Sequence, residues 1–152
     1  MTATNHALTG AAIGLLIGQP VVAIPAALAS HFICDIIPHY RADVTEKRLL
    51  KSNKFRNYLL LEAAVCLLIV IGLAVLHPLN WRLAAICAFV AASPDLLYIN
   101  RYRQVRRGHS WRPGRFVAFA SRIQWFERPI GGAVEVAWFI AAIAVLTPFL
   151  LR

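Results

Sequence analysis

The sequence predicts an all-α protein: a polytopic membrane bundle of about five hydrophobic helices with one amphipathic helix on its cytoplasmic side. Two observations predict this class. Hydrophobic residues make up 59% of the 152-residue chain, charged residues only 15%, and the mean hydropathy is +0.61, which is too apolar for an ordinary soluble domain. Uncharged runs also recur, at residues 63–76, 83–93 and 136–151. The length suits a single membrane domain covering residues 1–152.

Five apolar segments are predicted to be helices. The first is short for a membrane span, which needs about 20 residues, and Gly-Gln-Pro at 18–20 ends it with a turn. The second ends before Pro38, because the residue preceding a proline disfavours helix. A turn at 77–80 separates the third from the fourth. The predicted helices cover residues 6–18, 21–37, 58–76, 81–98 and 131–151.

Basic residues are concentrated in two predicted loops, 39–57 and 99–130. Of the 16 Lys and Arg residues, six lie in the first loop and eight in the second. The positive-inside bias of membrane proteins predicts that both loops are cytoplasmic. The N-terminus is then cytoplasmic and the C-terminus outside, in a multi-pass protein of the cell membrane. We expect the loops to meet anionic lipid headgroups rather than nucleic acid.

The second basic loop contains an amphipathic pattern between residues 115 and 128. Aromatic and aliphatic side chains recur there at three- and four-residue spacing, while Arg115 and Arg122 lie largely off that stripe. This pattern predicts a helix lying in the membrane interface, or one packed on the ends of the bundle. The apolar stripe consists of Phe116, Phe119, Ile123 and Phe126.

The three cysteines and the N-terminal residues receive structural interpretations. Cys34, Cys66 and Cys87 lie inside apolar helices without the spacing of a zinc knuckle or a disulfide scaffold, so we expect small core residues. The first six residues lack the basic region of a signal peptide. Thr2 to Asn5 instead resembles a helix cap.

Polar side chains interrupt the second apolar segment at His31, Asp35 and His39, four residues apart. Residues at this spacing lie on one face of a helix, so His31 and Asp35 should point the same way, with His39 just past the helix end. Such groups are costly inside a membrane unless they find partners.

The predicted topology brings further polar groups to the same depth, near the cytoplasmic leaflet. Imidazoles and carboxylates gathered in this way are the ligand set that a divalent metal ion requires. Zinc is the metal we expect first, with manganese and iron as alternatives. The additional polar residues at this depth are His6, Glu62, Asp95 and Glu135.

Several of these residues also have a structural interpretation. A histidine at a helix exit, such as His39, is commonly interfacial. Glu62 and Glu135 lie near predicted helix N-termini, where carboxylates are favoured by the helix dipole. His77 belongs to a turn and His109 to a loop.

Three motifs resemble a known family. They are Asn-His-Ala-Leu-Thr-Gly at 5–10, His-x-x-x-Asp-x-x-Pro-His at 31–39 and Ser-Pro-Asp at 93–95. This layout resembles the predicted membrane-bound metal-dependent hydrolases, which are related in pattern to zinc-dependent phospholipase C. The stretch 123–135 resembles a feature of small bacterial members. Larger members carry Thr-His-Ser in the central loop, where this chain has Gly-His-Ser at 108–110.

The resemblance implies a divalent-metal site and hydrolysis of a phosphoester or lipid-linked bond. The substrate would be a phosphate-bearing lipid or a related amphiphile at the cytoplasmic leaflet. His39 and Glu135 would be catalytic, as a general base or an additional ligand. The implied metal ligands are His6, His31, Asp35 and Asp95.

The basic loop at 101–128 is expected to hold the anionic headgroup of this substrate. A guanidinium group matches a phosphate through two parallel hydrogen bonds, which favours arginine for the task. We assign this role to Arg101, Arg103 and His109.

Two other functions fit the same residues. Intramembrane acids and histidines also form proton or ion relays in small transporters, although those sites lie nearer the middle of the bilayer. Alternatively, the polar cluster is a hydrogen-bonded network in a non-catalytic membrane scaffold whose loops bind anionic lipid.

Overall fold

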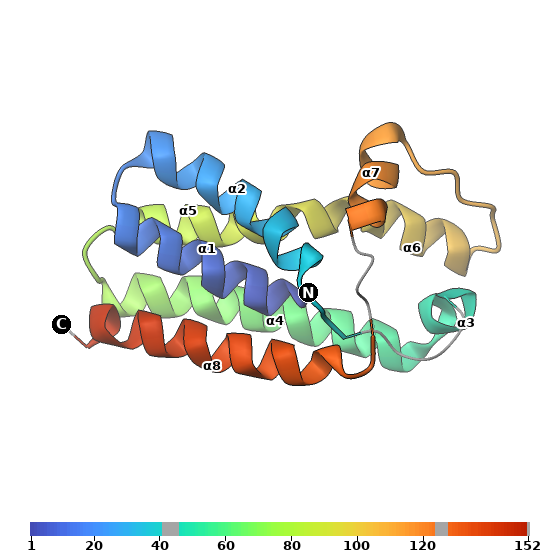
Figure 1. The fold of residues 1–152 in the computed structure, drawn as a ribbon. Coiled ribbons are helices and arrows are strands. Elements are labelled where there is room, and N and C mark those ends of the chain that lie inside the picture. Colours follow the sequence, from blue (N-terminus) through green and yellow to red (C-terminus); the bar gives the residue numbers. More distant parts are fainter. Residues whose placement is uncertain (41–45, 124–127, 152) are drawn as a thin grey trace.

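A computed structural model describes residues 1–40, 46–123 and 128–151, and every regular element in these residues is a helix, which confirms the all-α prediction for this part of the chain (Figure 1). One short 3₁₀ segment, η1, joins two of the α-helices. The elements are α1 (Ala3–Ile17), α2 (Pro20–Ile36), α3 (Glu46–Lys51), α4 (Asn53–Leu76), α5 (Trp81–Ala92), η1 (Ser93–Leu97), α6 (Tyr98–Arg106), α7 (Arg115–Ile123) and α8 (Gly131–Leu150).

Helix α1 is the central element of the bundle. It packs against α2, α4, α5 and α8. Figure 1 shows α2 on one side of α1 and α4 with α8 on the other. The first residues of α1 therefore lie among the ends of several other helices, which is the position that a shared polar site requires.

The closest helix contact joins α1 to α5 through small residues. A Cβ atom added to Gly10 would lie 2.2 Å from the carbonyl oxygen of Cys87, and one added to Gly14 would lie 2.5 Å from the Cα atom of Ala84. Small residues let two helix backbones approach within van der Waals contact, which drives helix association where apolar burial cannot. This contact sets the register between α1 and the end of α5.

Three helices are long and apolar enough to cross a membrane, among the residues that the structure describes. They are Asn53–Leu76, Trp81–Arg106 taken as one continuous helical rod, and Gly131–Leu150. Helices α1 and α2 have 15 and 17 residues and are shorter. The prediction of five apolar helices therefore locates the right segments, but the number that is long enough to span is smaller.

The two predicted loops are wrong in part, because both contain helices. The 39–57 loop holds α3 and the start of α4, which begins at Asn53 because Ser52 caps it by accepting a hydrogen bond from the Lys54 backbone N–H. The 99–130 loop holds α6 and α7. Pro94 does not stop the fourth helix, because it occupies the first turn of η1, where a missing N–H is tolerated.

The predicted amphipathic helix is present as α7, and Phe116 packs edge-to-face on Phe32 of α2. The predicted continuation over residues 124–127 lies outside the described residues.

The predicted cap of α1 is confirmed, since the Thr2 hydroxyl accepts a hydrogen bond from the Asn5 backbone N–H at 3.3 Å. The cysteines are free, with Cys34 and Cys87 buried and Cys66 half-buried.

Candidate metal centre

Two buried histidines meet where the start of α1 passes the end of α2. The His6 and His31 side chains are 0% and 2% exposed, and their rings stack with centroids 4.0 Å apart. The tight turn after Gly18, which adopts a left-handed φ of 67°, makes α1 and α2 antiparallel neighbours. The first helix of the pair thus begins where the second one ends, and the two imidazoles come together.

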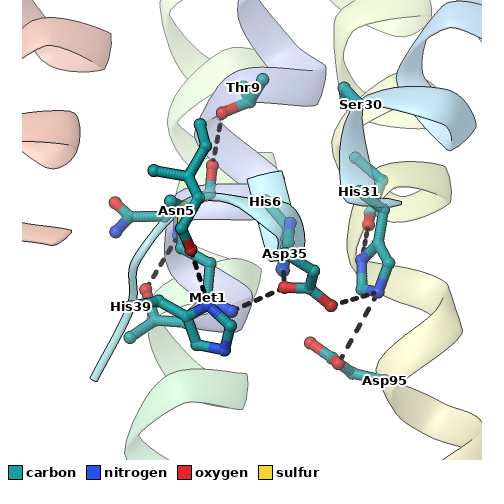
Figure 2. A network of polar contacts seen from close by, with 12 residues as sticks. Met1, Asn5, His6, Thr9, Ser30, His31, Asp35, His39 and Asp95 are labelled. Carbon is teal, nitrogen blue, oxygen red and sulfur yellow. Dashed lines mark hydrogen bonds and ion pairs between the residues drawn. The ribbon is translucent and has the colours of Figure 1, made fainter. Parts of the chain in front are cut away.

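Asp35 lies between the two histidines, as Figure 2 shows. Its Oδ1 is 3.2 Å from Nε2 of His6 and its Oδ2 is 3.4 Å from Nε2 of His31. Oδ1 also accepts a hydrogen bond from the amino group of Met1 at 2.6 Å. A carboxylate that contacts two imidazoles holds both rings in place, a role carboxylates commonly have beside metal-bound histidines.

The backbone of α5 orients the second histidine. Nδ1 of His31 lies 2.8 Å from the carbonyl oxygen of Ala91. A carbonyl can only accept, so Nδ1 carries the proton and donates. In the neutral ring the lone pair is then on Nε2, which faces the carboxylates of Asp35 and Asp95. A lone pair facing carboxylate oxygens leaves room for a cation or a proton between them.

Asp95 adds a third candidate ligand to the two histidines. It is carried by η1, and its Oδ1 lies 4.0 Å from Nε2 of His31. One ligand atom each from His6, His31 and Asp95 lies within 4.8 Å of the others. Ligand atoms bound to zinc at about 2.1 Å are at most about 4.2 Å apart, so modest side-chain rotation would bring this set around one ion.

The buried ring of His6 also fits an ion-binding role. Nδ1 of this fully buried side chain has no hydrogen-bond partner among the described residues, whereas Nε2 lies 3.2 Å from Oδ1 of Asp35. Buried polar atoms are nearly always paired, and an unpaired one is a sign of an ion or water. The donor set of two imidazoles and a carboxylate is one that zinc, manganese and iron all accept.

Glu62 and Glu135 support the frame around the site. Glu62 Oε2 accepts hydrogen bonds of 2.9 Å from both the backbone N–H and the hydroxyl of Thr4, at the positive end of α1. Glu135 Oε1 accepts the Tyr40 N–H at 3.2 Å, and its carbonyl accepts from the Asn5 amide. The structural interpretation of these two acids thus has direct support, and both also line a large cavity described below.

His39 lies apart from the two stacked histidines. Helix α2 ends at Ile36, and the extended backbone of Ile37 turns the chain away from the helical spacing. Nδ1 of His39 contacts the Ile37 carbonyl oxygen at 2.9 Å. The His39 backbone is held against α8, where a Cβ atom on Gly131 would lie 2.1 Å from the carbonyl carbon of His39. The helical spacing of the motif therefore holds for its first two members and ends before the third.

A cavity of about 1360 Å³ opens beside this site, between α4 and the α5–η1–α6 rod. Asp95, whose side chain is 33% exposed, reaches it from the cluster. Its polar end also includes the His39 and Glu135 side chains and Arg101. An ion held by His6, His31 and Asp95 would thus lie at the wall of a large cavity.

The three predicted headgroup residues are placed differently. Arg101 lines the large cavity and, with His109, a smaller one of about 410 Å³. Arg103 is exposed and lines neither.

The sequence did not predict the contacts made by the Ala91 carbonyl and by Thr4 and Asn5. Only the polar run preceding His6 signals the last two, and a backbone carbonyl leaves no signal at all.

The chain matches no protein-family model, no curated protein and no solved structure. The geometry of the residues described above therefore carries the functional argument.

Proposed function

We propose that the protein is a membrane-embedded, metal-dependent hydrolase that acts on a phosphate-bearing lipid at the cytoplasmic leaflet. The observation that carries this proposal is the convergence of His6, His31 and Asp95 within 4.8 Å at the wall of a cavity. Burying two imidazoles beside carboxylates is costly unless cations balance the acids. The amino group of Met1 pairs with Asp35, and a metal ion would balance Asp95.

His6 and His31 would supply nitrogen ligands and Asp95 an oxygen ligand to zinc, with manganese or iron as alternatives. Asp35 would orient both imidazoles or serve as a fourth ligand, since it contacts each Nε2 atom. A bound divalent ion polarises a phosphoryl oxygen and makes water more acidic, which is the chemistry that phosphoester hydrolysis requires.

The remaining residues would bind the substrate and move protons. Arg101 lines the polar end of the cavity, where its guanidinium group would bind a phosphate through two hydrogen bonds. His109 would assist it from the adjoining smaller cavity. Glu135 and His39, which line the large cavity, would accept a proton from water. Because Arg103 lines neither cavity, we leave it out of this proposal.

A proton relay is the second candidate, because His6, Asp35 and His31 form a continuous chain of contacts. The residues that follow His6 inside α1 do not extend it. They include Ala7, Leu8 and Ala11, which are buried and apolar. A relay across a membrane needs proton carriers over most of its depth, so this arrangement favours a site over a pathway.

The test is elemental analysis of the protein purified in detergent, followed by hydrolysis of phosphatidic acid in mixed micelles. We expect about one bound ion per chain, lost together with phosphate release in His31→Ala. His77→Ala is the matched control, since His77 is an exposed turn residue far from the cluster in sequence. This variant should keep both the bound ion and phosphate release. A wild-type chain that takes up no zinc, manganese or iron would contradict the proposal.

A further inference from the structure

The large cavity continues from the candidate metal centre as an apolar groove. On α4 its lining residues follow a helical stripe at spacings of one, three and four. Across from them lie Ile86 and Phe89 of α5, both exposed. Helices α4 and α5 contact each other, and Ala7 of the central helix α1 also lines the groove. Its α4 lining comprises Lys54, Phe55, Tyr58, Leu59, Glu62, Ala63, Cys66, Leu67 and Val70.

The groove has one polar end and one apolar end. Glu62, Asp95 and Arg101 line the polar end, and Lys54 adds a second cation there. From Glu62 to Val70 the groove follows α4 for roughly 12 Å, at 1.5 Å per residue. Both helices that form it are long and apolar enough to cross a membrane, so its apolar part lies at the depth of lipid tails.

We infer that this groove holds one acyl chain of the substrate, with the phosphate of the same lipid at Arg101 and Lys54. The inference rests on the proposed function, because it places a lipid at the metal centre. The distribution of polarity supports a lipid over a partner helix. The charged lining residues gather at one end of the groove, and its α4 lining from Ala63 to Val70 is uncharged. The charged residues are Lys54, Glu62, Asp95, Arg101 and Glu135. An anionic lipid has the matching pattern, with negative charge at one end only.

The groove also explains how a membrane lipid would reach a buried site. A lipid would enter sideways between α4 and α5 without leaving the bilayer, since Leu67, Ile86 and Phe89 line the groove and are exposed. Asp95 stands where the apolar lining meets the basic residues, so the reacting phosphoester would lie beside it. The volume of about 1360 Å³ exceeds the range of about 300–1,000 Å³ typical of small-molecule pockets, as a lipid requires.

The probe is phosphatidic acid carrying a photoactivatable diazirine in one acyl chain, in nanodiscs of phosphatidylcholine. After irradiation, labelled residues are mapped by mass spectrometry. We expect labelling concentrated at residues 63–70 and 86–89, above that of Phe139 and Ile140, which are exposed on α8. Labelling spread evenly over the exposed faces of α4, α5 and α8 would overturn the inference, as would a second copy of the chain found cross-linked in the groove.

Two neighbouring alanines give a matched pair of variants. Ala63 lines the groove, whereas Ala64 is also exposed on α4 but does not line it. Ala63→Trp fills the groove and should reduce labelling about tenfold, as expected for losing contact with a few methylene groups. Ala64→Trp should leave labelling unchanged. Equal labelling of the two variants would contradict the groove as the acyl site.

Cys66 provides a readout that needs no groove-filling variant. It lines the groove and is half-buried, whereas Cys34 and Cys87 are buried. We expect phosphatidic acid, but not phosphatidylcholine, to slow alkylation of Cys66 by a membrane-permeant maleimide. Equal alkylation rates with both lipids would overturn the inference. This test uses the wild-type chain, so it does not depend on whether Ala63→Trp folds.

The same measurements in His31→Ala separate this inference from the proposed function. Labelling of the groove that persists without bound metal or hydrolysis would support the acyl site while the hydrolase proposal fails. Hydrolysis by the wild type with evenly distributed labelling would retain the hydrolase and reject the acyl site.

Discussion

The two ends of the helix bundle both carry histidine at helix ends, and the comparison shows what makes one end a candidate site. At one end, His6 and His31 are buried, stacked and joined by Asp35. At the other, His77 is exposed, caps α4 with a left-handed φ of 47°, and packs edge-to-face on Trp81. The residue type is the same at both ends. Burial beside several carboxylates distinguishes the first end, where Nδ1 of His6 has no hydrogen-bond partner among the described residues.

The difference arises from which helices meet. At the polar end, the start of α1 and the end of α2 converge with η1, so three elements contribute side chains to a small volume. At the opposite end, His77 lies in the α4–α5 turn, and its ring contacts Trp81, four residues further along the chain. Convergence of separate elements therefore creates the ligand geometry, and a histidine at a turn cannot do so alone.

The largest effect that would sharpen this comparison is expected from Asp35→Asn. Replacing the carboxylate removes the charge that faces Nε2 of both histidines, and loss of such an orienting group typically lowers metal affinity about 10–100-fold. The measurement is zinc titration by isothermal calorimetry in detergent. Glu62→Gln is the control, because Glu62 binds Thr4 at the same end without contacting either histidine ring, and its zinc affinity should change little. Equal affinities for wild type and Asp35→Asn would rule out an orienting or ligand role for Asp35.

Acidification should produce a somewhat smaller loss of zinc affinity. Imidazole binds a metal ion only in its neutral form, so two histidine ligands make binding compete with protons. Lowering the pH from about 8 to about 5 should weaken zinc binding by up to about tenfold, which is less than for free imidazoles, because burial disfavours the protonated form of both rings. The same titration repeated across this range measures it.

His77→Ala should follow the same pH profile as the wild type, since His77 lies at the opposite end of the bundle. An affinity that stays constant from about pH 8 to about pH 5 would argue against histidine ligands.

The smallest effect concerns packing at the two ends. Gly131→Ala places a Cβ atom 2.1 Å from the carbonyl carbon of His39, so backbone must move, and overpacking of this kind costs about 1–3 kcal/mol. Gly72→Ala in α4 meets nothing within 4 Å and replaces glycine with a better helix former, so it should be neutral or stabilising. Thermal unfolding in the same detergent compares the two variants. A Gly131→Ala protein as stable as Gly72→Ala would show that α8 does not pack closely on His39.

Much of the polar end could be predicted from periodicity. The spacing of His31 and Asp35 places both on one helix face, and charged loops predict the depth that they share with His6 and Asp95. The convergence of His6, His31 and Asp95 agrees with that prediction. The position of His39 could not be obtained in this way, because its place depends on where α2 ends and on a close backbone contact with Gly131.

The helices inside the basic segments, α3 and α6, could not be predicted from hydropathy. Hydropathy identifies segments that are apolar along their length, so α3 and α6, which are rich in lysine and arginine, were expected to be loops. Helix propensity of lysine, arginine and leucine, together with the Ser52 cap, accounts for α3 and the early start of α4.

The sequence by itself determined that the chain is helical, that its apolar segments suit a membrane, and that its ligand-type residues fall near helix ends, because these properties depend on local composition and period. The tertiary structure decided which of those residues meet. The packing of α2 on α5, where Ala27 and Ala91 share one buried cluster, brings the Ala91 carbonyl to His31, and the packing of α1 on α5 through Gly10 and Gly14 fixes the helix that carries His6. The groove between α4 and α5 likewise arises from side chains far apart in the chain, and no local pattern encodes their separation.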